Sequence, residues 1–503
     1  MQWELETIGV TKRFGPVTAN EGVDLRVKKG EVHAVMGENG AGKSTLMSML
    51  YGLLQPDDGE ILIAGRQVHF TSALDAIGHG LGMVHQAFQL FEELTVWENI
   101  VMGAEPARRG FLDRRRAIAS VAGLAERYDL KVDVTQRVRD LSVGIRQRVE
   151  ILKALYRDAQ ILILDEPTAV LTPQERDGLF AVIRALRDDG RTILFVTHKL
   201  HEVMEITDSV TVLRQGRVTE RMATKESTPE AIITAMTGRS VSLDVAKGPA
   251  TPGEIVLQVA GLTVGQGPKP AVADVSITVR AGEIVGIAGV AGNGQSELIE
   301  AIAGLRPGSG RVTLKGRDIA SLRVAERREA GLAYIPEDRA ATGTAAGATA
   351  AETLLMGRQG DAALSRGGLL NLPAISERAR RLIAQNDIRI SSERAKVGTL
   401  SGGNLQKVVI ARELDHEAPL LIAEQPTRGV DVGAIEAIHA RIVAERDAGR
   451  AVLLVSAEMS EVLGLSDRIL VMYEGRILAE LPASEATEAQ LGLLMAGRTG
   501  EAA

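Results

Sequence analysis

The stretch that decides the fold is "GENGAGKST", Gly37–Thr45, which follows the apolar segment "VHAVM". Its pattern G-x-x-x-x-G-K-[ST], between a predicted strand and a predicted helix, is typical of a phosphate-binding loop. The glycines let backbone N–H groups approach phosphate oxygens, and the helix N-terminus adds positive potential. Lys43 would reach the β- and γ-phosphates, and Ser44 would offer a hydroxyl to Mg²⁺. The alternative, a glycine turn that binds nothing, is disfavoured by the strand and helix on either side.

A second apolar segment, "ILILDEPT" (Ile161–Thr168), ends in two carboxylates. Asp165 would hold Mg²⁺ through its water shell, and Glu166 would polarise the attacking water as a general base. Acidic residues also occur at helix N-termini without catalysis, because the helix dipole favours negative charge there. The phosphate loop earlier in the chain favours the catalytic interpretation.

The bulk composition excludes several classes of protein. A net charge of -7 disfavours a nucleic-acid binder, which needs a basic face, and the absence of cysteine excludes disulfides and thiolate metal sites. The N-terminal "MQWELETIGV" does not resemble a signal peptide. No apolar run approaches the ~18 residues of a membrane-spanning helix, so we expect any membrane role to come through a partner.

The chain contains one unit written twice. The block Lys28–Leu46 recurs 252 residues later as Arg280–Leu298, and "ILILDEPTAVLT" recurs 259 residues later as "LLIAEQPTRGVD". The repeat predicts a first domain over residues 1–244, a linker over 245–253 and a second domain over 254–503. Continuous apolar runs such as "TILFVT" are typical of buried strands in a parallel sheet. The helix-rich middle of the first half, about Leu94–Asp158, is predicted to be an inserted helical subdomain.

The order of the motifs carries a resemblance. With "LSVG" (Leu141–Gly144) before the Asp-Glu strand and "VTH" (Val196–His198) after it, the chain resembles an ABC-type ATPase. The resemblance implies an α/β fold of two tandem ABC-type P-loop nucleotide-binding domains. Each would have a RecA-like parallel-sheet core with an inserted helical subdomain, and the cofactors would be ATP and Mg²⁺.

The resemblance also implies roles for single residues. Gln86 would sense the metal and the membrane partner, His198 would contact the γ-phosphate, and Phe14 would stack on adenine. The alternatives are a structural histidine and a core phenylalanine. The implied catalytic residues are Glu166 and His198, and the implied metal ligands are Ser44, Gln86 and Asp165. The implied nucleotide contacts are Phe14, Gly37, Asn39, Gly40, Ala41, Gly42, Lys43, Ser44, Thr45, Gln86, Asp165, Ser401, Gly402 and Gly403.

The second half has lost the chemistry of the first. Gln425 replaces Glu166, and an amide has no basicity near neutral pH with which to act as a general base. The positions that correspond to Phe14, Lys43, Gln86, Asp165, Glu166 and His198 are Gln266, Gln295, Glu337, Glu424, Gln425 and Ala457.

One motif is better preserved in the second half, which has "LSGGN" (Leu400–Asn404) where the first has "LSVGI". In ABC ATPases each signature faces the phosphate loop of the other domain. We therefore expect one competent composite site, with Lys43, Glu166 and Ser401, and one degenerate site. Whether the degenerate site holds a nucleotide without hydrolysing it, or only packs, stays open.

Further motifs narrow the family. "PTRGVDVGA" (Pro426–Ala434), "YIPEDR" (Tyr334–Arg339) and "LSGGN" are similar to ATPase subunits of bacterial importers for simple sugars and nucleosides. "EPTAVLTPQE" and the "QPTRG" form favour the nucleoside branch over the sugar branch. A soluble ABC translation factor is a weaker alternative, because the linker is short and one site is dismantled.

This resemblance implies partners and a location. The partners would be two membrane permease subunits and an extracytoplasmic solute-binding protein, with no nucleic acid. The chain would be a peripheral protein on the cytoplasmic face of the bacterial cell membrane. The segment 86–99 has exposed-looking aromatics, Phe88, Phe91 and Trp97, which could contact the permease or face the core.

Overall fold

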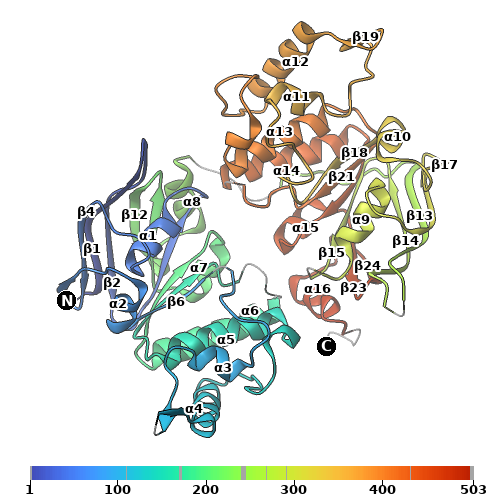
Figure 1. Cartoon of the computed structure of the whole chain (residues 1–503). Helices are drawn as coiled ribbons and strands as arrows, with labels where there is room; N and C mark the ends of the chain where they lie inside the picture. Colours follow the sequence, from blue (N-terminus) through green and yellow to red (C-terminus); the bar gives the residue numbers. More distant parts are fainter. Residues whose placement is uncertain are drawn as a thin grey trace. The chain divides into compact units, whose positions relative to one another are not determined.

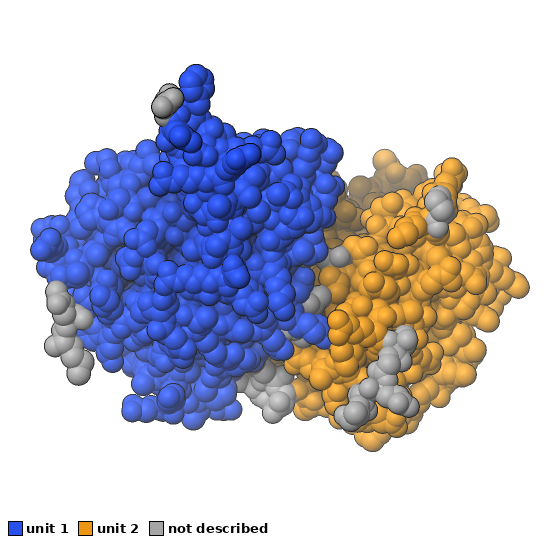
Figure 2. Space-filling model, turned by 90° about the horizontal axis from the view of Figure 1, so that it is seen from below, with its two compact units in different colours: residues 1–241 blue, residues 242–503 orange. Residues whose placement is uncertain are grey.

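The computed structural model describes residues 3–498 except 86, 109, 169–170, 172, 240–244, 268, 291 and 431. The chain divides into two compact units, Met1–Val241 and Ser242–Ala503 (Figure 2). In each unit, sheets and helices alternate along the chain, which confirms the predicted α/β class (Figure 1). The segment 245–253, predicted as a linker, contacts the second unit: Lys247 Nζ donates to the carbonyl of Leu465 at 2.9 Å and pairs with Asp467 at 3.3 Å.

The first unit holds two main sheets and the two-stranded sheet β7–β8, with helices between and around their strands. Its strands are β1 Trp3–Phe14, β2 Val17–Lys28, β3 Val32–Gly37, β4 Asp58–Ile63, β5 Arg66–Val68, β6 Leu81–Val84, β7 Ala107–Arg108, β8 Phe111–Leu112, β9 Ile161–Asp165, β10 Thr192–Val196, β11 Ser209–Arg214 and β12 Arg217–Ala223. Its α-helices are α1 Lys43–Leu50, α2 Ala73–Gly78, α3 Val96–Val101, α4 Arg114–Arg127, α5 Val143–Tyr156, α6 Pro173–Asp188, α7 Leu200–Ile206 and α8 Pro229–Thr237.

The second unit repeats these elements in the same order. Its strands are β13 Ile255–Val264, β14 Val272–Arg280, β15 Glu283–Ala288, β16 Ser309–Leu314, β17 Arg317–Asp318, β18 Leu332–Ile335, β19 Ser365–Arg366, β20 Leu369–Leu370, β21 Leu420–Glu424, β22 Ala451–Val455, β23 Arg468–Tyr473 and β24 Arg476–Pro482. Its α-helices are α9 Gln295–Ala303, α10 Val324–Glu329, α11 Ala350–Leu355, α12 Leu372–Gln385, α13 Gly402–Leu414, α14 Val432–Asp447, α15 Met459–Leu465 and α16 Glu488–Met495.

The larger sheet of the first unit has the strand order β12-β11-β3-β10-β9-β6, and all its neighbours are parallel except the edge pair β11–β12. The order β18-β21-β22-β15-β23-β24 in the second unit is the same arrangement. Strands β3 and β10 are buried along their whole length, as expected for a sheet covered on both faces. The four-stranded antiparallel sheets are β2-β1-β4-β5 and β14-β13-β16-β17.

Helix α1 lies between the two sheets of the first unit. Its residues Leu46 and Leu50 share one hydrophobic core with Leu5 of the small sheet and with Val35 and Ile163 of the large one. All five side chains are about 0% exposed. This packing fixes the start of α1, and with it the phosphate loop, at the end of β3.

The helices α3, α4 and α5 lie between β6 and β9 in the chain and form the predicted helical subdomain (Figure 1). Of the two alternatives left open for the aromatic residues of segment 86–99, the structure shows the core-facing one at Trp97. Trp97 is only 3% exposed and belongs to the core of this subdomain, because α3 turns that face toward α4 and α5. Phe91, in contrast, is 59% exposed.

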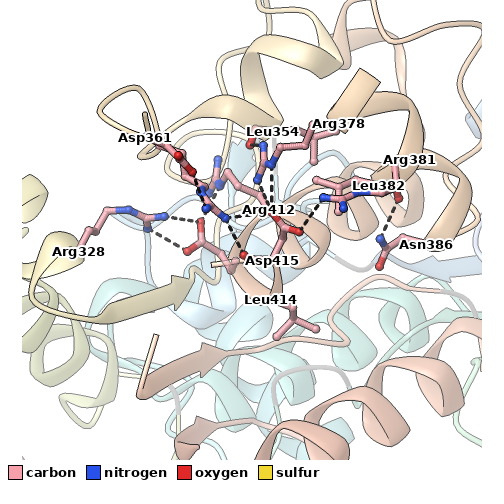
Figure 3. A network of polar contacts seen from close by, with 12 residues as sticks. Arg328, Leu354, Asp361, Arg378, Arg381, Leu382, Asn386, Arg412, Leu414 and Asp415 are labelled. Carbon is pink, nitrogen blue, oxygen red and sulfur yellow. Dashed lines mark hydrogen bonds and ion pairs between the residues drawn. The ribbon is translucent and has the colours of Figure 1, made fainter. Parts of the chain in front are cut away.

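A polar network anchors the helical subdomain of the second unit (Figure 3). Glu413, which is completely buried on α13, accepts hydrogen bonds from Arg412 at 2.6 Å and from Arg328 of α10 at 2.9 Å. One residue after α13, Asp415 pairs with Arg378 of α12 and with Arg358 at 3.2 Å. These ion pairs thus connect α10 and α12 to the C-terminal end of α13. They fix relative positions of the helices that apolar packing alone would not specify.

Candidate functional site

The parallel register of the first unit brings three predicted segments to one edge of the sheet. Val196 of β10 pairs with Asp165 of β9 on one side and with Val35 of β3 on the other. The carboxyl ends of the three strands are therefore neighbours, and ligands bind at this edge in open α/β sheets. The phosphate loop follows β3, Glu166 follows β9, and His198 follows β10.

The phosphate loop needs its glycines. Gly42 is the N-cap of α1 with φ of 97°, and a Cβ added there would lie 2.5 Å from the carbonyl oxygen of Ala19. Gly40 also has a positive φ, 80°, and a Cβ on it would meet nothing within 4 Å. Backbone N–H groups at the start of α1 are left without helical acceptors, so the loop offers donors to an anion.

Lys43 is held against the loop that precedes it. The side chain is only 6% exposed, and Nζ donates to the carbonyls of Gly37 at 2.7 Å and Glu38 at 3.1 Å. Ser44 and Thr45 follow in the first turn of α1, and Asn39 and Ala41 lie in the loop. The loop thus holds a buried ammonium group whose positive charge would attract the oxygens of a bound phosphate.

The two carboxylates at the end of β9 have opposite electrostatic surroundings. Burial, and then the charge of Glu166, raise the pKa of Asp165 to about 6, while Lys43 opposes this rise. The hydrogen bond from His198 lowers the pKa of Glu166, against the effect of burial. Glu166 is therefore ionised at neutral pH, and Asp165 is a carboxylate that a nearby cation would favour in its charged form.

His198 and Glu166 are in direct contact, since Nδ1 of the imidazole lies 2.9 Å from Oε1 of the carboxylate. Glu166 has a left-handed backbone, with φ of 47°, and its N–H donates to the carbonyl of Val196 at 2.9 Å. The backbone of β10 thereby fixes the direction of the Glu166 side chain. This contact orients the ionised carboxylate, which suits a general base.

These residues fit a magnesium nucleotide. A buried lysine, a hydroxyl at Ser44 and an acid at Asp165 are hard donors and charges suited to phosphate and Mg²⁺. A Cβ on Gly37 or Gly42 would clash with the carbonyl oxygen of Leu213 or of Ala19, so only glycine fits these two positions of the loop.

The other implied contacts lie in different elements. Phe14 ends β1, is 47% exposed, and has Lys12 Nζ 5.9 Å from its ring centroid. Gln86 lies outside the described residues. Ser401 is the N-cap of α13, where its hydroxyl accepts from the amide nitrogen of the Asn404 side chain at 3.0 Å, and Gly402 and Gly403 begin that helix.

The sequence analysis missed Asn20. This side chain is completely buried and donates to the carbonyl of Gly42 at 3.2 Å, so it supports the phosphate loop from β2. Its counterpart in the repeat is Val272, which cannot make that bond. The polar-to-apolar change between the two halves was the signal that could have found it.

In the second unit an amide takes over the structural contact of the lysine. Gln295 is 6% exposed, and its Nε2 donates to the carbonyl of Val290 at 3.1 Å. Gly294, the N-cap of α9, has φ of 104°, close to that of Gly42. The start of the helix therefore keeps its backbone conformation, but the position that corresponds to Lys43 holds an amide without charge for a phosphate.

In the second unit, residues at the other positions of the corresponding site form hydrogen bonds and an ion pair with one another. The Tyr334 hydroxyl donates to Glu424 at 2.6 Å, Ser296 donates to Glu337 at 3.4 Å, and Arg428 pairs with Glu337. Gln425 Oε1 accepts from the backbone N–H of Ala457 at 3.0 Å, in place of a histidine. These groups do not fit the magnesium nucleotide that the first unit fits.

Comparison with known proteins agrees with this geometry. The model of the "ABC transporter" family matches residues 20–169 and 272–428. The chain belongs to the ABC transporter family. This ABC protein therefore has two ABC-type domains, as predicted, and it is an ATPase.

Relatives of this ABC ATPase match it over nearly its whole length. It is 47% identical to the guanosine import ATP-binding protein NupO of Bacillus subtilis, over 99% of this chain and 98% of that protein. It is 44% identical to the nucleoside import ATP-binding protein NupA of Lactococcus lactis, over 98% of both chains. A ribose import ATP-binding protein, RbsA 1 of Rubrobacter xylanophilus, is 43% identical over 98% of both.

A solved structure shares the fold of this ABC ATPase. It is the complex of an archaeal ribosomal stalk protein with the ribosome recycling factor aABCE1, with a TM-score of 0.60 and 20% identity over 94% of this chain and 90% of that one. This likeness concerns the fold alone. In the part of the chain that the structure describes, no helix is long and apolar enough to cross a membrane.

Proposed function

We propose that this ABC ATPase drives the import of nucleosides, using ATP hydrolysed at the first unit. The observation that carries the chemistry is the contact of His198 with an ionised Glu166 beside the buried Lys43. The choice of solute is supported by the relatives that are named for guanosine and nucleoside import. The import of simple sugars is the second candidate, because ribose import proteins follow closely in identity.

In the proposed mechanism each residue of the first unit has one task. Glu166 takes the proton of the attacking water, and His198 orients Glu166 and stabilises its charge. Lys43 neutralises phosphate oxygens. Ser44, Asp165 and Gln86 would hold Mg²⁺, whose positive charge would offset the negative charge of the phosphates when it is bound. Phe14 would stack on adenine, and Asn39 and Thr45 would complete the cradle.

We propose that Ser401, Gly402 and Gly403 complete the same site by capping the γ-phosphate. The support is the family resemblance, together with the retention of "LSGGN" in the half that has lost its own general base. A serine hydroxyl and free amides at a helix start are suitable donors to a phosphate.

The proposed partners are two membrane permease subunits and an extracytoplasmic solute-binding protein. With them the chain would associate peripherally with the cytoplasmic face of the bacterial membrane. Names that include "import" among the relatives support such an assembly.

Uptake by cells tests the proposal. Labelled nucleosides, pentoses and hexoses are compared in strains that carry the chain or its Glu166→Gln variant. We expect nucleoside uptake to be lost in the variant while sugar uptake is unchanged.

Loss of sugar uptake instead would keep the ATP-driven importer and overturn the choice of solute. If neither uptake changes, the importer function itself is wrong. Cofractionation of the chain with ribosomes would then be measured, because a translation factor would bind them.

A further inference from the structure

Each unit carries a small hairpin that has no part in nucleotide chemistry. In the first unit β7 and β8 form it just before α4, and in the second unit β19 and β20 form it just before α12. Figure 1 shows β19 beyond the end of α12, away from the sheets of its unit. The sequence analysis predicted a helical subdomain for the first of these regions and did not foresee the hairpins.

The two hairpins present apolar side chains to solvent. Phe111 is 80% exposed and Leu112 51%, while Leu369 is 78% exposed and Leu370 45%. Large apolar residues at such exposure are costly in water, and groups of them mark interaction surfaces.

The register of the two hairpins is the same. Arg108 pairs with Phe111 in the first, and Arg366 pairs with Leu369 in the second. In both, the residue after the apolar pair caps the following helix: Asp113 accepts from the N–H of Arg116 at 3.1 Å, and Asn371 does the same for α12. The exposed apolar pair is thus kept at one structural position although its first residue is Phe111 in one hairpin and Leu369 in the other, which indicates a use for it.

The first hairpin is also strongly basic. Residues 105–116 contain five arginines and two acidic residues, in a chain whose net charge is -7. The side chains of Arg108, Arg114, Arg115 and Arg116 are exposed. The acidic charge of Asp113 is engaged with the start of α4. An exposed apolar pair flanked in the chain by arginines is complementary to an anionic lipid surface, which offers an apolar layer beneath negative headgroups.

The direction of the side chains also favours a lipid surface. Consecutive residues of a strand point to opposite faces, so Phe111 and Leu112 project to the two sides of the hairpin. A protein groove would cover one face and leave the other wet. A fluid interface accepts both faces at once.

We propose that the β7–β8 hairpin inserts into the surface of a membrane that contains anionic phospholipid. This contact is independent of the transported solute. It would hold the ATPase at the membrane in addition to any contact with permease subunits.

Vesicle cosedimentation of the full chain tests the proposal. We expect binding to vesicles of phosphatidylglycerol and phosphatidylcholine, and much weaker binding to phosphatidylcholine alone or at high salt, where the Debye length falls to a few ångströms. Phe111→Ser with Leu112→Ser should weaken binding about tenfold, because buried apolar area is lost. Arg115→Glu should weaken it about fivefold or more.

Matched controls separate the hairpin from general effects. Leu74→Ser removes a side chain that is 71% exposed on α2, and Lys225→Glu reverses an exposed charge; both should bind as the parent chain does. ATP hydrolysis should be unchanged in every variant, which confirms folding. Equal binding by the hairpin variants and the parent, or no binding by the parent, would overturn the proposal.

A second readout distinguishes lipid from permease. In Phe111→Trp, brominated phospholipid should quench emission that the parent chain lacks; the parent's own tryptophans are Trp3 on β1 and Trp97, which is buried in the subdomain core. If the new tryptophan is not quenched, and the hairpin variants instead fail to copurify with the permease subunits, the hairpin contacts protein and the proposal is wrong.

Discussion

Glu166 and Gln425 share one backbone position in the two units but differ in chemistry. Their φ angles are 47° and 48°, and their N–H groups donate to Val196 at 2.9 Å and to Val455 at 2.7 Å. The left-handed backbone persists in the second unit, where the side chain is an amide. Such strain is a property of the repeated fold, and only the side chain decides whether the position is a base.

Glu166→Gln should lower kcat for ATP hydrolysis by about 10²–10⁴, because the general base is lost, while ATP binding stays. Phosphate release and nucleotide binding are measured side by side. Gln425→Glu is the matched control and should change turnover little, because the second unit also has Gln295 and Ala457. Hydrolysis regained when Gln425→Glu is added to Glu166→Gln would contradict the view that several losses act together.

Glu424 should make the second unit less stable as pH rises. It is 2% exposed, its Oε1 has no partner among the described residues, and burial raises its pKa. The folded chain therefore holds the proton more tightly than the unfolded chain, so the free energy of unfolding falls as pH rises from the usual pKa of a glutamate through the raised one.

Glu424→Gln should remove that dependence, so its stability relative to the parent should increase with pH. The free energy of unfolding is measured with urea at a series of pH values from about 4 to about 8. This interval covers the titration of a carboxylate whose pKa is raised. Glu417→Gln, at an exposed site, is the control. A stability difference that is constant over this range would show that Glu424 is not the titrating group.

At the scale of elements, charged residues hold the helical subdomain of the second unit. Tyr334 of β18 donates its backbone N–H to Glu413 at 3.1 Å, so this carboxylate joins the sheet to α10 and α13. Burial acts to raise the pKa of Glu413, but Arg412 and Arg328 hold it below its usual value. The ion pairs of Glu413 act mainly to connect these elements, because removing one partner would leave an uncompensated buried charge.

Glu413→Gln should lower the free energy of unfolding of the second unit by about 3–5 kcal/mol, because two guanidinium groups lose their counter-charge. Thermal and urea unfolding measure it. Glu300→Gln breaks a partly exposed pair with Arg306 and should cost about 0–1 kcal/mol. Equal effects of the two substitutions would mean that the buried network does not anchor the subdomain.

At the scale of the whole molecule, the two halves should contribute unequally to one reaction. Ser401→Ala should lower ATP hydrolysis by on the order of 10², the usual effect of losing one donor to a developing charge. Ser142→Ala, in the signature of the first half, should have little effect. Steady-state hydrolysis measures both, and equal losses would contradict a single competent composite site.

The sequence by itself determined the repeat, the α/β class, the phosphate loop and the carboxylates at the end of β9. These are local patterns: continuous apolar strands and motifs with fixed spacing fold the same way wherever they occur. Only the tertiary structure decided that His198 contacts Glu166, that Asn20 supports Gly42, and that Trp97 is buried while Phe111 is exposed. Those outcomes depend on which distant segments pack together, and neither periodicity nor spacing encodes such long-range contacts.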